Sequence, residues 1–270
     1  MKLSIITINY NNKQGLQLTI ASILSQEWTD FEWIVVDGGS TDGSKELIEK
    51  YNDHFVWWCS EPDKGIYNAM NKGVSHAVGD YINFMNSGDC FYDEKSLLNL
   101  FGLNPQGDII YGNAYWGLNK KYIFNSPNTL SIDYFVEGSL GHAASFILTD
   151  LLRKNPYDEK YKIVSDWKNW IIWLNEGRNF NHVDVPIACF DIEGISSINK
   201  PLDQKEREEV WHELFPDEIR KTIFQYHQCV KKNKLNPELN QIYVLINKKM
   251  AYRKIVRFVK NVLLRIDKLI

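Results

Sequence analysis

The feature that most constrains this chain is the alternation of short apolar runs with helical segments over its first hundred residues. Four apolar runs have the length of buried strands: Leu3–Ile8, Trp33–Asp37, Phe55–Cys59 and Tyr81–Met85. Segments with helical character separate them, over 16–24, 44–51 and 66–77. Strands that alternate with helices predict βαβ units and a parallel sheet.

The second half of the chain departs from this regular pattern. We expect further strands, separated by long loops, at Asp108–Tyr111, Lys121–Phe124, Ala143–Leu148 and Val183–Phe190. From Leu202 onward the pattern is helical, and Pro216 and Pro237 are expected to start or break helices. The sequence therefore predicts an α/β domain with a mixed sheet over 1–201 and a helical extension over 202–270.

Composition and charge exclude several classes of protein. With 44% hydrophobic residues among 270, the chain can bury a core and is not a disordered or collagen-like protein. The net charge of -3 gives no general attraction to nucleic acid. The four cysteines lack metal-like spacing, which indicates reduced thiols, and no apolar run approaches the ~18 residues of a membrane-spanning helix. We expect a cytoplasmic protein without a signal peptide.

Polar segments follow three of the expected strands directly. They are Asn9-Tyr10-Asn11, Asp37-Gly38-Gly39-Ser40 and Asn86-Ser87-Gly88-Asp89. Ligands of open α/β sheets bind beyond the carboxyl ends of the strands, so these segments are the expected binding site. None of them contains the glycine pattern of a dinucleotide-binding loop or the glycine and lysine pattern of a P-loop.

Four motifs at these positions resemble a known family in order and spacing: SIITINYNN, WIVVDGGSTDGS, EPDKGIYNAMNKG and DYINFMNSGDCF. They are similar to the nucleotide-sugar-binding half of family 2 glycosyltransferases with the GT-A fold. Looser similarity to the acceptor half of bacterial polysaccharide-assembling members continues over 141–148, 157–174 and 194–197. The resemblance implies a GT-A-type mixed sheet whose Rossmann-like donor-binding half spans 1–92 and whose acceptor half spans 93–201.

The resemblance implies a metal-binding role for Asp89. Where the family commonly carries two acidic residues, this chain has Asn86-Ser87-Gly88-Asp89, so one carboxylate remains. A single aspartate can hold Mn2+ or Mg2+ if phosphate oxygens and water complete the coordination. Ser87 and Gly88 are then expected to contact the donor. The alternative is an ordinary acidic turn.

The resemblance also implies that Asp37 accepts a hydrogen bond from a uracil ring, which favours a UDP-linked donor. Thr7, Asn9 and Tyr10 fall where the family contacts the base. Asp37 could instead satisfy only the backbone of its own turn, because Asp is a common turn residue. Tyr10 could instead be a buried structural tyrosine.

Three further donor contacts follow from the same resemblance. Asp63 is similar to a base or ribose contact, and Lys64 could meet phosphate, although both could equally belong to a solvated turn. His142 resembles a position near the donor sugar and the metal. A lone histidine is also often structural.

Asp166 is the expected catalytic base, because it matches the position of the family's catalytic acidic residue. A base is needed to take the proton of the acceptor hydroxyl. Ser165 or Asp166 could also cap the helix that follows. Asp158 and Glu159 are the next candidates. Three tryptophans at helical spacing could stack on sugars or form core: Trp167, Trp170 and Trp173.

The last thirty residues carry eight Lys or Arg residues and one acidic residue, Asp267. Apolar residues recur between Lys248 and Leu269 at three- and four-residue steps, which predicts a basic amphipathic helix. Such a helix can bind the inner leaflet of a membrane peripherally, or it can pack on protein.

We therefore expect an inverting, metal-dependent glycosyltransferase. It would move a hexose or N-acetylhexosamine from a UDP sugar to a glycan or lipid-linked acceptor in bacterial surface polysaccharide synthesis. A nucleotidyltransferase is one alternative, but it would normally carry a basic Gly-rich loop after the first strand. A catalytically degenerate binding protein is the other, and the single carboxylate at Asp89 favours it.

Overall fold

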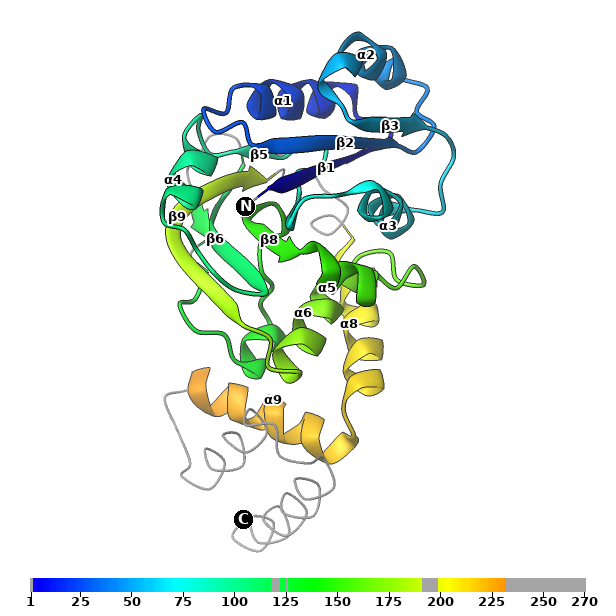
Figure 1. Ribbon diagram of the computed structural model, residues 1–270. Helices are drawn as coiled ribbons and strands as arrows, with labels where there is room; N and C mark the ends of the chain where they lie inside the picture. Colours follow the sequence, from blue (N-terminus) through cyan, green and yellow to red (C-terminus); the bar gives the residue numbers. More distant parts are fainter. Residues whose placement is uncertain (1, 118–121, 125, 191–198, 232–270) are drawn as a thin grey trace, which may run out of the picture. The chain divides into compact units, whose positions relative to one another are not determined.

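The computed structural model describes residues 2–117, 122–124, 126–190 and 199–231. Within these residues, nine strands form one sheet in the order β3-β2-β1-β4-β8-β6-β9-β5, and β7 pairs with β6 (Figure 1). The strands are β1 (Leu3–Asn9), β2 (Phe31–Asp37), β3 (Trp57–Ser60), β4 (Tyr81–Phe84), β5 (Cys90–Phe91), β6 (Ile109–Trp116), β7 (Tyr122–Phe124), β8 (Ser145–Leu148) and β9 (Phe180–Phe190).

The sheet is parallel in its first half and mixed in its second. β1 pairs in parallel with β2 and β4, and β2 with β3. β8 runs antiparallel to both β4 and β6, whereas β9 is parallel to β6. These pairings confirm the predicted α/β mixed sheet. From β1, the chain adds β2 and β3 on one side and then β4 on the other, so the strand order reverses between β1 and β4. The carboxyl ends of these four parallel strands lie at the same edge of the sheet.

Some elements differ from those expected. β6 and β9 are longer than predicted because they pair with each other along much of their length. β5 was not expected, since it consists of two residues that become a strand only through pairing with β9. The short helices α4 (Ser96–Gly102) and α5 (Thr149–Lys154) were also missed.

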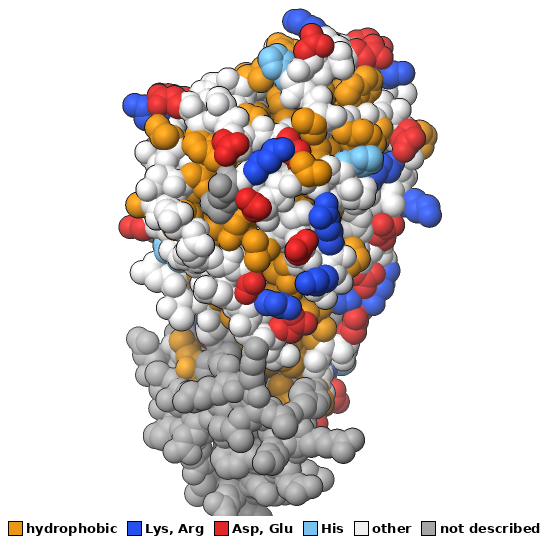
Figure 2. Space-filling view, in the orientation of Figure 1, with side chains coloured by type: hydrophobic (Ala, Val, Ile, Leu, Met, Phe, Trp, Pro, Cys, Tyr) orange, Lys and Arg blue, Asp and Glu red, His pale blue; other side chains and the backbone are white. Residues whose placement is uncertain are grey.

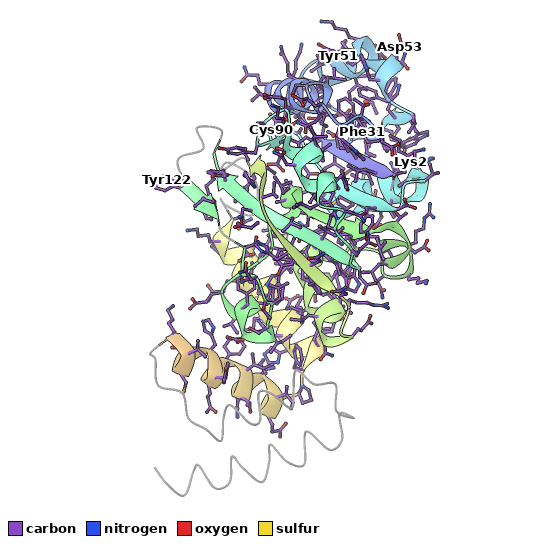
Figure 3. The ribbon with its side chains drawn as sticks, turned by 60° about the vertical axis from the view of Figure 1, so that its left-hand side comes forward. Lys2, Phe31, Tyr51, Asp53, Cys90 and Tyr122 are labelled. Atoms are coloured by element: carbon purple, nitrogen blue, oxygen red, sulfur yellow. The ribbon has the colours of Figure 1, made fainter. Side chains whose placement is uncertain are left out.

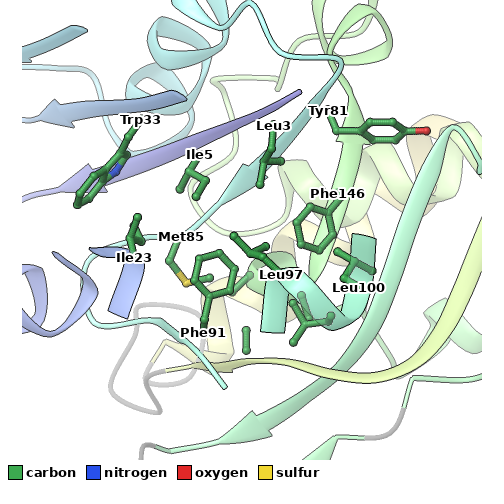
Figure 4. Close-up of a cluster of buried hydrophobic side chains, with 14 of the residues drawn as sticks. Leu3, Ile5, Ile23, Trp33, Tyr81, Met85, Phe91, Leu97, Leu100 and Phe146 are labelled. Atoms are coloured by element: carbon green, nitrogen blue, oxygen red, sulfur yellow. The ribbon is translucent and has the colours of Figure 1, made fainter. Parts of the chain in front are cut away.

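Helices cover both faces of the parallel half of the sheet. They are α1 (Lys13–Leu24), α2 (Ser44–Lys50) and α3 (Ile66–His76). Leu3 and Ile5 of β1 belong to the buried cluster that includes Leu16 of α1 (Figure 4 draws part of it). On the opposite face Gly73 lets α3 approach the sheet, since a Cβ there would lie 2.6 Å from Cγ2 of Ile6. The alternate faces of β1 are thus both buried.

The chain divides into two compact units. One comprises 1–129, 140–166 and 179–200 and contains the whole sheet; the other comprises 130–139, 167–178 and 201–270. The division expected at residue 202 stays a prediction. The segment 194–197 and the basic stretch 241–270 lie outside the described residues. Among the helices that are described, none is long and apolar enough to cross a bilayer.

The second unit contains η2 (Ile132–Val136), most of α6 (Ser165–Asn175), α8 (Lys200–Leu214) and α9 (Asp217–Lys231). Pro216 directly precedes α9, as expected of a helix start. Trp167 packs edge-on against Trp211 of α8, and the guanidinium of Arg207 lies over its ring. The indoles of Trp167, Trp170 and Trp173 are all buried, which makes them core residues rather than a sugar platform.

One face of the described part is mixed in charge. On the face that Figure 2 shows, acidic and basic side chains are interspersed among polar and apolar ones.

Candidate active site at the carboxyl edge of the sheet

The carboxylate of Asp37, at the end of β2, binds residues that follow or end both neighbouring strands. Its Oδ1 accepts hydrogen bonds from Asn9 Nδ2 at 2.7 Å and Ser40 Oγ at 2.5 Å. Its Oδ2 accepts from Ser60 Oγ at 2.6 Å and from the Ser40 amide at 2.9 Å. These bonds fill the four acceptor positions of an ionised carboxylate. They join the carboxyl ends of β1, β2 and β3.

This network keeps Asp37 ionised although the residue is fully buried. Burial opposes ionisation, but the hydrogen bonds from Ser40, Ser60 and Asn9 outweigh it and hold the pKa of the carboxyl below its ordinary value. The structure therefore gives Asp37 the backbone-satisfying role considered above, and extends it across three strands. A contact with a base would require one of the hydroxyls to turn away.

Tyr10 and Asp63 lie side by side against Gly38. A Cβ at Gly38 would lie 2.7 Å from Asp63 Oδ2 and 3.2 Å from Tyr10 Cδ2, so a larger residue there would displace the Asp63 carboxylate. Tyr10 is 67% exposed, and the buried structural role considered for it is therefore wrong. Asp63 Oδ1 accepts a hydrogen bond from the Gly65 amide at 2.7 Å, and the side chain of Lys64 is exposed.

The turn Asn86-Ser87-Gly88-Asp89 after β4 is held against α1. Thr19 accepts the Gly88 amide at 3.0 Å and donates its hydroxyl to the Asp89 carbonyl at 2.7 Å. The side chain of Asn12 donates to the Ser87 carbonyl at 3.2 Å. Gly88 has a φ of +102°, which favours glycine at this position. Figure 3 labels Cys90, the residue that directly follows Asp89 and begins β5.

The oxygen ligands available at this turn are few. Asp89 offers one half-exposed carboxylate. Oδ1 of Asn86 is buried and has no hydrogen-bond partner within the described residues. No group of three or more His, Cys, Asp or Glu residues in that part of the chain could hold a metal ion. Hard oxygen atoms suit Mg2+ and Mn2+, so these residues fit a cation that arrives with a diphosphate, not one held by protein ligands alone.

Asp166 lies in the first turn of α6, where a carboxylate interacts favourably with the helix dipole. The helix begins at Ser165, so Asp166 does not precede it as a cap. The hydroxyl of Tyr67, in the first turn of α3, lies 2.6 Å from Asp166 Oδ1. Nδ1 of His142 lies 4.0 Å from Asp166 Oδ2, and both side chains are partly accessible, at 14% for His142 and 18% for Asp166.

Aromatic side chains surround this carboxylate. The Tyr157 hydroxyl lies 2.9 Å from Nε2 of His142, and the ring of Phe84 packs on His142 at a centroid distance of 4.7 Å. Burial lowers the pKa of His142 and outweighs the opposing effect of Asp166, so the imidazole is neutral at neutral pH. Burial, reinforced by Asp166, raises the pKa of Tyr67 and Tyr157, so both phenols keep their protons.

The chain's sequence matches a family model over half of its length. The model described as glycosyl transferase family 2 matches residues 4–140. The chain belongs to glycosyl transferase family 2. An uncharacterized glycosyltransferase of Mycobacterium tuberculosis is 33% identical over 176 residues, which are 60% of this chain and 65% of the relative. A PGL/p-HBAD biosynthesis glycosyltransferase of Mycobacterium bovis is 27% identical over 197 residues, 70% of this chain and 76% of the relative.

Solved structures share the fold of this family 2 chain. S. aureus TarS in complex with UDP-GlcNAc matches with a TM-score of 0.64 at 17% identity, over 91% of this chain and 79% of that one. The mannosyltransferase PcManGT of Pyrobaculum calidifontis, in complex with GDP-Man and Mn2+, matches with a TM-score of 0.56 at 13% identity, over 96% and 73%. The GT-A-type fold is thereby confirmed.

Two groups of the predicted site residues have side-chain partners other than those described above. Thr7 of this family 2 chain is fully buried, and its hydroxyl accepts the indole N–H of Trp33 at 3.0 Å. Glu159 is bound at 2.9 Å by Asn68 Nδ2, and Asp158 pairs with Lys160 at 3.5 Å. The base contact of Thr7 and the catalytic role of Asp158 or Glu159 stay predictions.

The structure adds side-chain contacts of residues to which the sequence analysis gave no individual role: Thr19, Ser40, Ser60, Tyr67 and Tyr157. Ser40 and Tyr67 lie inside motifs that carry the family resemblance, and that position was the one available signal. The partners of Thr19 and Tyr157 are distant in sequence. Nothing in the local pattern around these two residues indicates a polar contact.

Replacing Asp37 by Asn should lower the free energy of unfolding at pH 7, by about 1–3 kcal/mol, because buried donors lose a charged acceptor. A lowered pKa means that the stabilisation is present above the unfolded value of about 3.9 and disappears as the pH falls through the folded value. Urea denaturation at pH 7 and near pH 2 measures both. The exposed Asp53, labelled in Figure 3, provides a matched Asn control. An equal loss for Asp37→Asn at both pH values would contradict the network.

Proposed function

We propose that this chain transfers a hexose or N-acetylhexosamine from a UDP-linked sugar to a glycan or lipid-linked acceptor. Relatives with glycosyltransferase names support the transfer, and the TarS complex with UDP-GlcNAc supports a UDP sugar as donor. The observation that carries the proposal is the partly accessible carboxylate of Asp166, whose Oδ1 is held by Tyr67.

The donor is proposed to bind along the carboxyl edge of the sheet. Tyr10 has an exposed ring that can pack on a pyrimidine, and it lies with Asp63 against Gly38, the residue after Asp37. The base would replace one hydroxyl as a hydrogen-bond donor to Asp37. Asn9 supports this carboxylate, while Ser87 and Gly88 lie in the turn that would face the diphosphate. Lys64 is an exposed cation at the start of α3 and could reach a phosphate.

In the proposed reaction, Asp166 acts as the general base. Tyr67 occupies Oδ1, so Oδ2 takes the proton of the acceptor hydroxyl. The acceptor oxygen bonds to the anomeric carbon as the bond from that carbon to the diphosphate oxygen breaks, and UDP leaves with the electron pair. One displacement of this kind inverts the configuration. His142 is neutral and cannot compete as a cation for the carboxylate.

Asp89 is proposed to hold Mn2+ or Mg2+ together with the diphosphate. GT-A enzymes commonly use a divalent metal, and the PcManGT complex contains Mn2+. A bound cation would neutralise the charge that develops on the leaving diphosphate. Asp89 and the turn that Thr19 fixes supply the protein side of such a site.

We further propose that the acceptor is lipid-linked and that residues 241–270 bring the chain to the inner leaflet. The support is the basic amphipathic pattern of this stretch, since each Lys or Arg near an anionic surface contributes about 1 kcal/mol. In this proposal 1–92 binds the donor, 93–201 the acceptor and 202–270 the membrane.

A second candidate is a degenerate protein that binds a nucleotide or carbohydrate without transferring sugar. The single carboxylate at Asp89, with no cluster of metal-ligating residues in the described part of the chain, favours it. Release of UDP from a panel of sugar nucleotides in the presence of acceptor distinguishes the two. Absence of release for every donor would favour the degenerate protein.

If Asp89 anchors the cation, UDP should bind at least about tenfold more tightly with Mn2+ than with EDTA, because the ion bridges carboxylate and diphosphate. Asp89→Ala should abolish this difference. Asp80→Ala provides a control, since Asp80 binds the Lys2 amide at 2.8 Å at the opposite end of β4. Calorimetry that finds metal-independent UDP binding, unchanged in Asp89→Ala, would refute the metal role.

If Asp166 is the base, Asp166→Asn should transfer sugar at least about a hundredfold more slowly, because the amide cannot take the acceptor proton. Asparagine can still accept from Tyr67, so the melting temperature and donor affinity should stay close to those of the wild type. Asp158→Asn is the matched control and should keep its rate. Near-normal transfer by Asp166→Asn would exclude this base and direct the search to Asp158 and Glu159.

A further inference from the structure

The hydroxyl of Tyr67 contacts two acceptor atoms at the same distance. It lies 2.6 Å from Asp166 Oδ1 and 2.6 Å from the backbone carbonyl oxygen of Ile163. A phenol carries one proton, so it can donate fully to only one of them at a time. Tyr67 is 4% exposed, and water has little access to satisfy the other contact.

We propose that Tyr67 is a positioning residue that holds Asp166 in place both before and after the carboxylate takes the acceptor proton. This inference rests on the proposed role of Asp166 as the base. While Asp166 is ionised, the Tyr67 O–H donates to Oδ1. Once Oδ2 of Asp166 holds the acceptor proton, Oδ1 remains a neutral and weaker acceptor of the Tyr67 O–H, and the Ile163 carbonyl competes for the same hydrogen.

Every proton is accounted for in this step. The acceptor hydroxyl gives its proton to the Asp166 carboxyl, and Tyr67 keeps its own proton throughout. No oxidant or further co-reactant is needed. Burial and the neighbouring Asp166 raise the pKa of Tyr67, which favours a phenol that stays protonated in both states.

The local backbone fixes the Tyr67 side chain for this role. Gly65, two residues before Tyr67, has a φ of +117°, a conformation that favours glycine, and α3 begins directly after it. The ring of Tyr67 packs against Tyr157 at a centroid distance of 5.4 Å. Among the described residues, the titratable groups that face Asp166 include Tyr67 from α3 and His142 from η3 (His142–Ala144), with Tyr157 beyond His142.

Removing the hydroxyl should affect the two protonation states unequally. A hydrogen bond to the ionised carboxylate is about twice as strong as one between neutral groups. Loss of the hydroxyl therefore disfavours the ionised form more. The acidic limb of the pH profile of the transfer rate should therefore move to higher pH.

The test compares Tyr67→Phe with Tyr81→Phe in the full chain. Tyr81 is a matched control: it is buried, lies on β4 and donates its hydroxyl to the Gly107 carbonyl at 2.6 Å. We expect Tyr67→Phe to lower kcat by about tenfold, because Asp166 loses its orientation, to leave the donor KM unchanged and to shift the acidic limb. Tyr81→Phe should lower only the melting temperature.

A wild-type kcat and pH profile for a folded Tyr67→Phe, with melting temperature lowered as in Tyr81→Phe, would overturn the inference. Asp166→Asn separates this outcome from failure of the proposed function. A slow Asp166→Asn beside an unaffected Tyr67→Phe rejects the positioning role alone, whereas a fully active Asp166→Asn rejects the base itself. If Tyr67→Phe lowers kcat without moving the limb, the unequal hold on the two protonation states is also rejected.

Discussion

The arrangement of the carboxyl edge of the sheet depends on the buried carboxylate of Asp37. Parallel strands end side by side, but nothing in the ladder itself fixes the loops that follow them. Four hydrogen bonds to one carboxylate fix the end of β1 through Asn9, the turn after β2 through Ser40 and the end of β3 through Ser60. A buried charge is tolerated only when it is satisfied in this way.

The turn that carries Asp89 and the side chain of Asp166 are held in a similar way, each by a single polar side chain from a segment distant in sequence. Thr19 on α1 fixes the turn that carries Asp89. Tyr67 on α3 holds Asp166, a residue 99 positions away. The helix α1 packs on one face of β1 and α3 on the other, so the packing of the core determines where these polar contacts form. The chemistry of the site therefore depends on apolar packing beneath it.

The sequence predicts much of this arrangement, and the reasons are local. The apolar run Leu3–Ile8 predicts a strand from its own residues, and the glycines after Asp37 predict a turn in the same way. The polar motifs that follow the strands then predict which edge of the sheet holds the site. β5 could not be predicted because it forms only by pairing with β9, where Cys90 lies opposite Cys189, a residue distant in sequence. The contact of Tyr67 with Asp166 could not be predicted for the same reason.

Tyr10 and Asp37 show how far residue type alone can mislead. A tyrosine after a buried strand could equally be core, yet Tyr10 is mostly exposed beside Asp63. Asp37 serves as a turn residue and also joins the ends of three strands, a role that neither of the two sequence interpretations included. Its ionised carboxylate is also the group proposed to accept a hydrogen bond from the nucleotide base of the donor.

The most direct test of this account is the relative affinity of the chain for UDP, GDP and ADP, measured by calorimetry with Mn2+ present. If Asp37 accepts a hydrogen bond from the base, UDP should bind at least about tenfold more tightly than either purine nucleotide, a difference of about 1.4 kcal/mol. Equal affinities for the three nucleotides would contradict the account and leave Asp37 with a purely structural role.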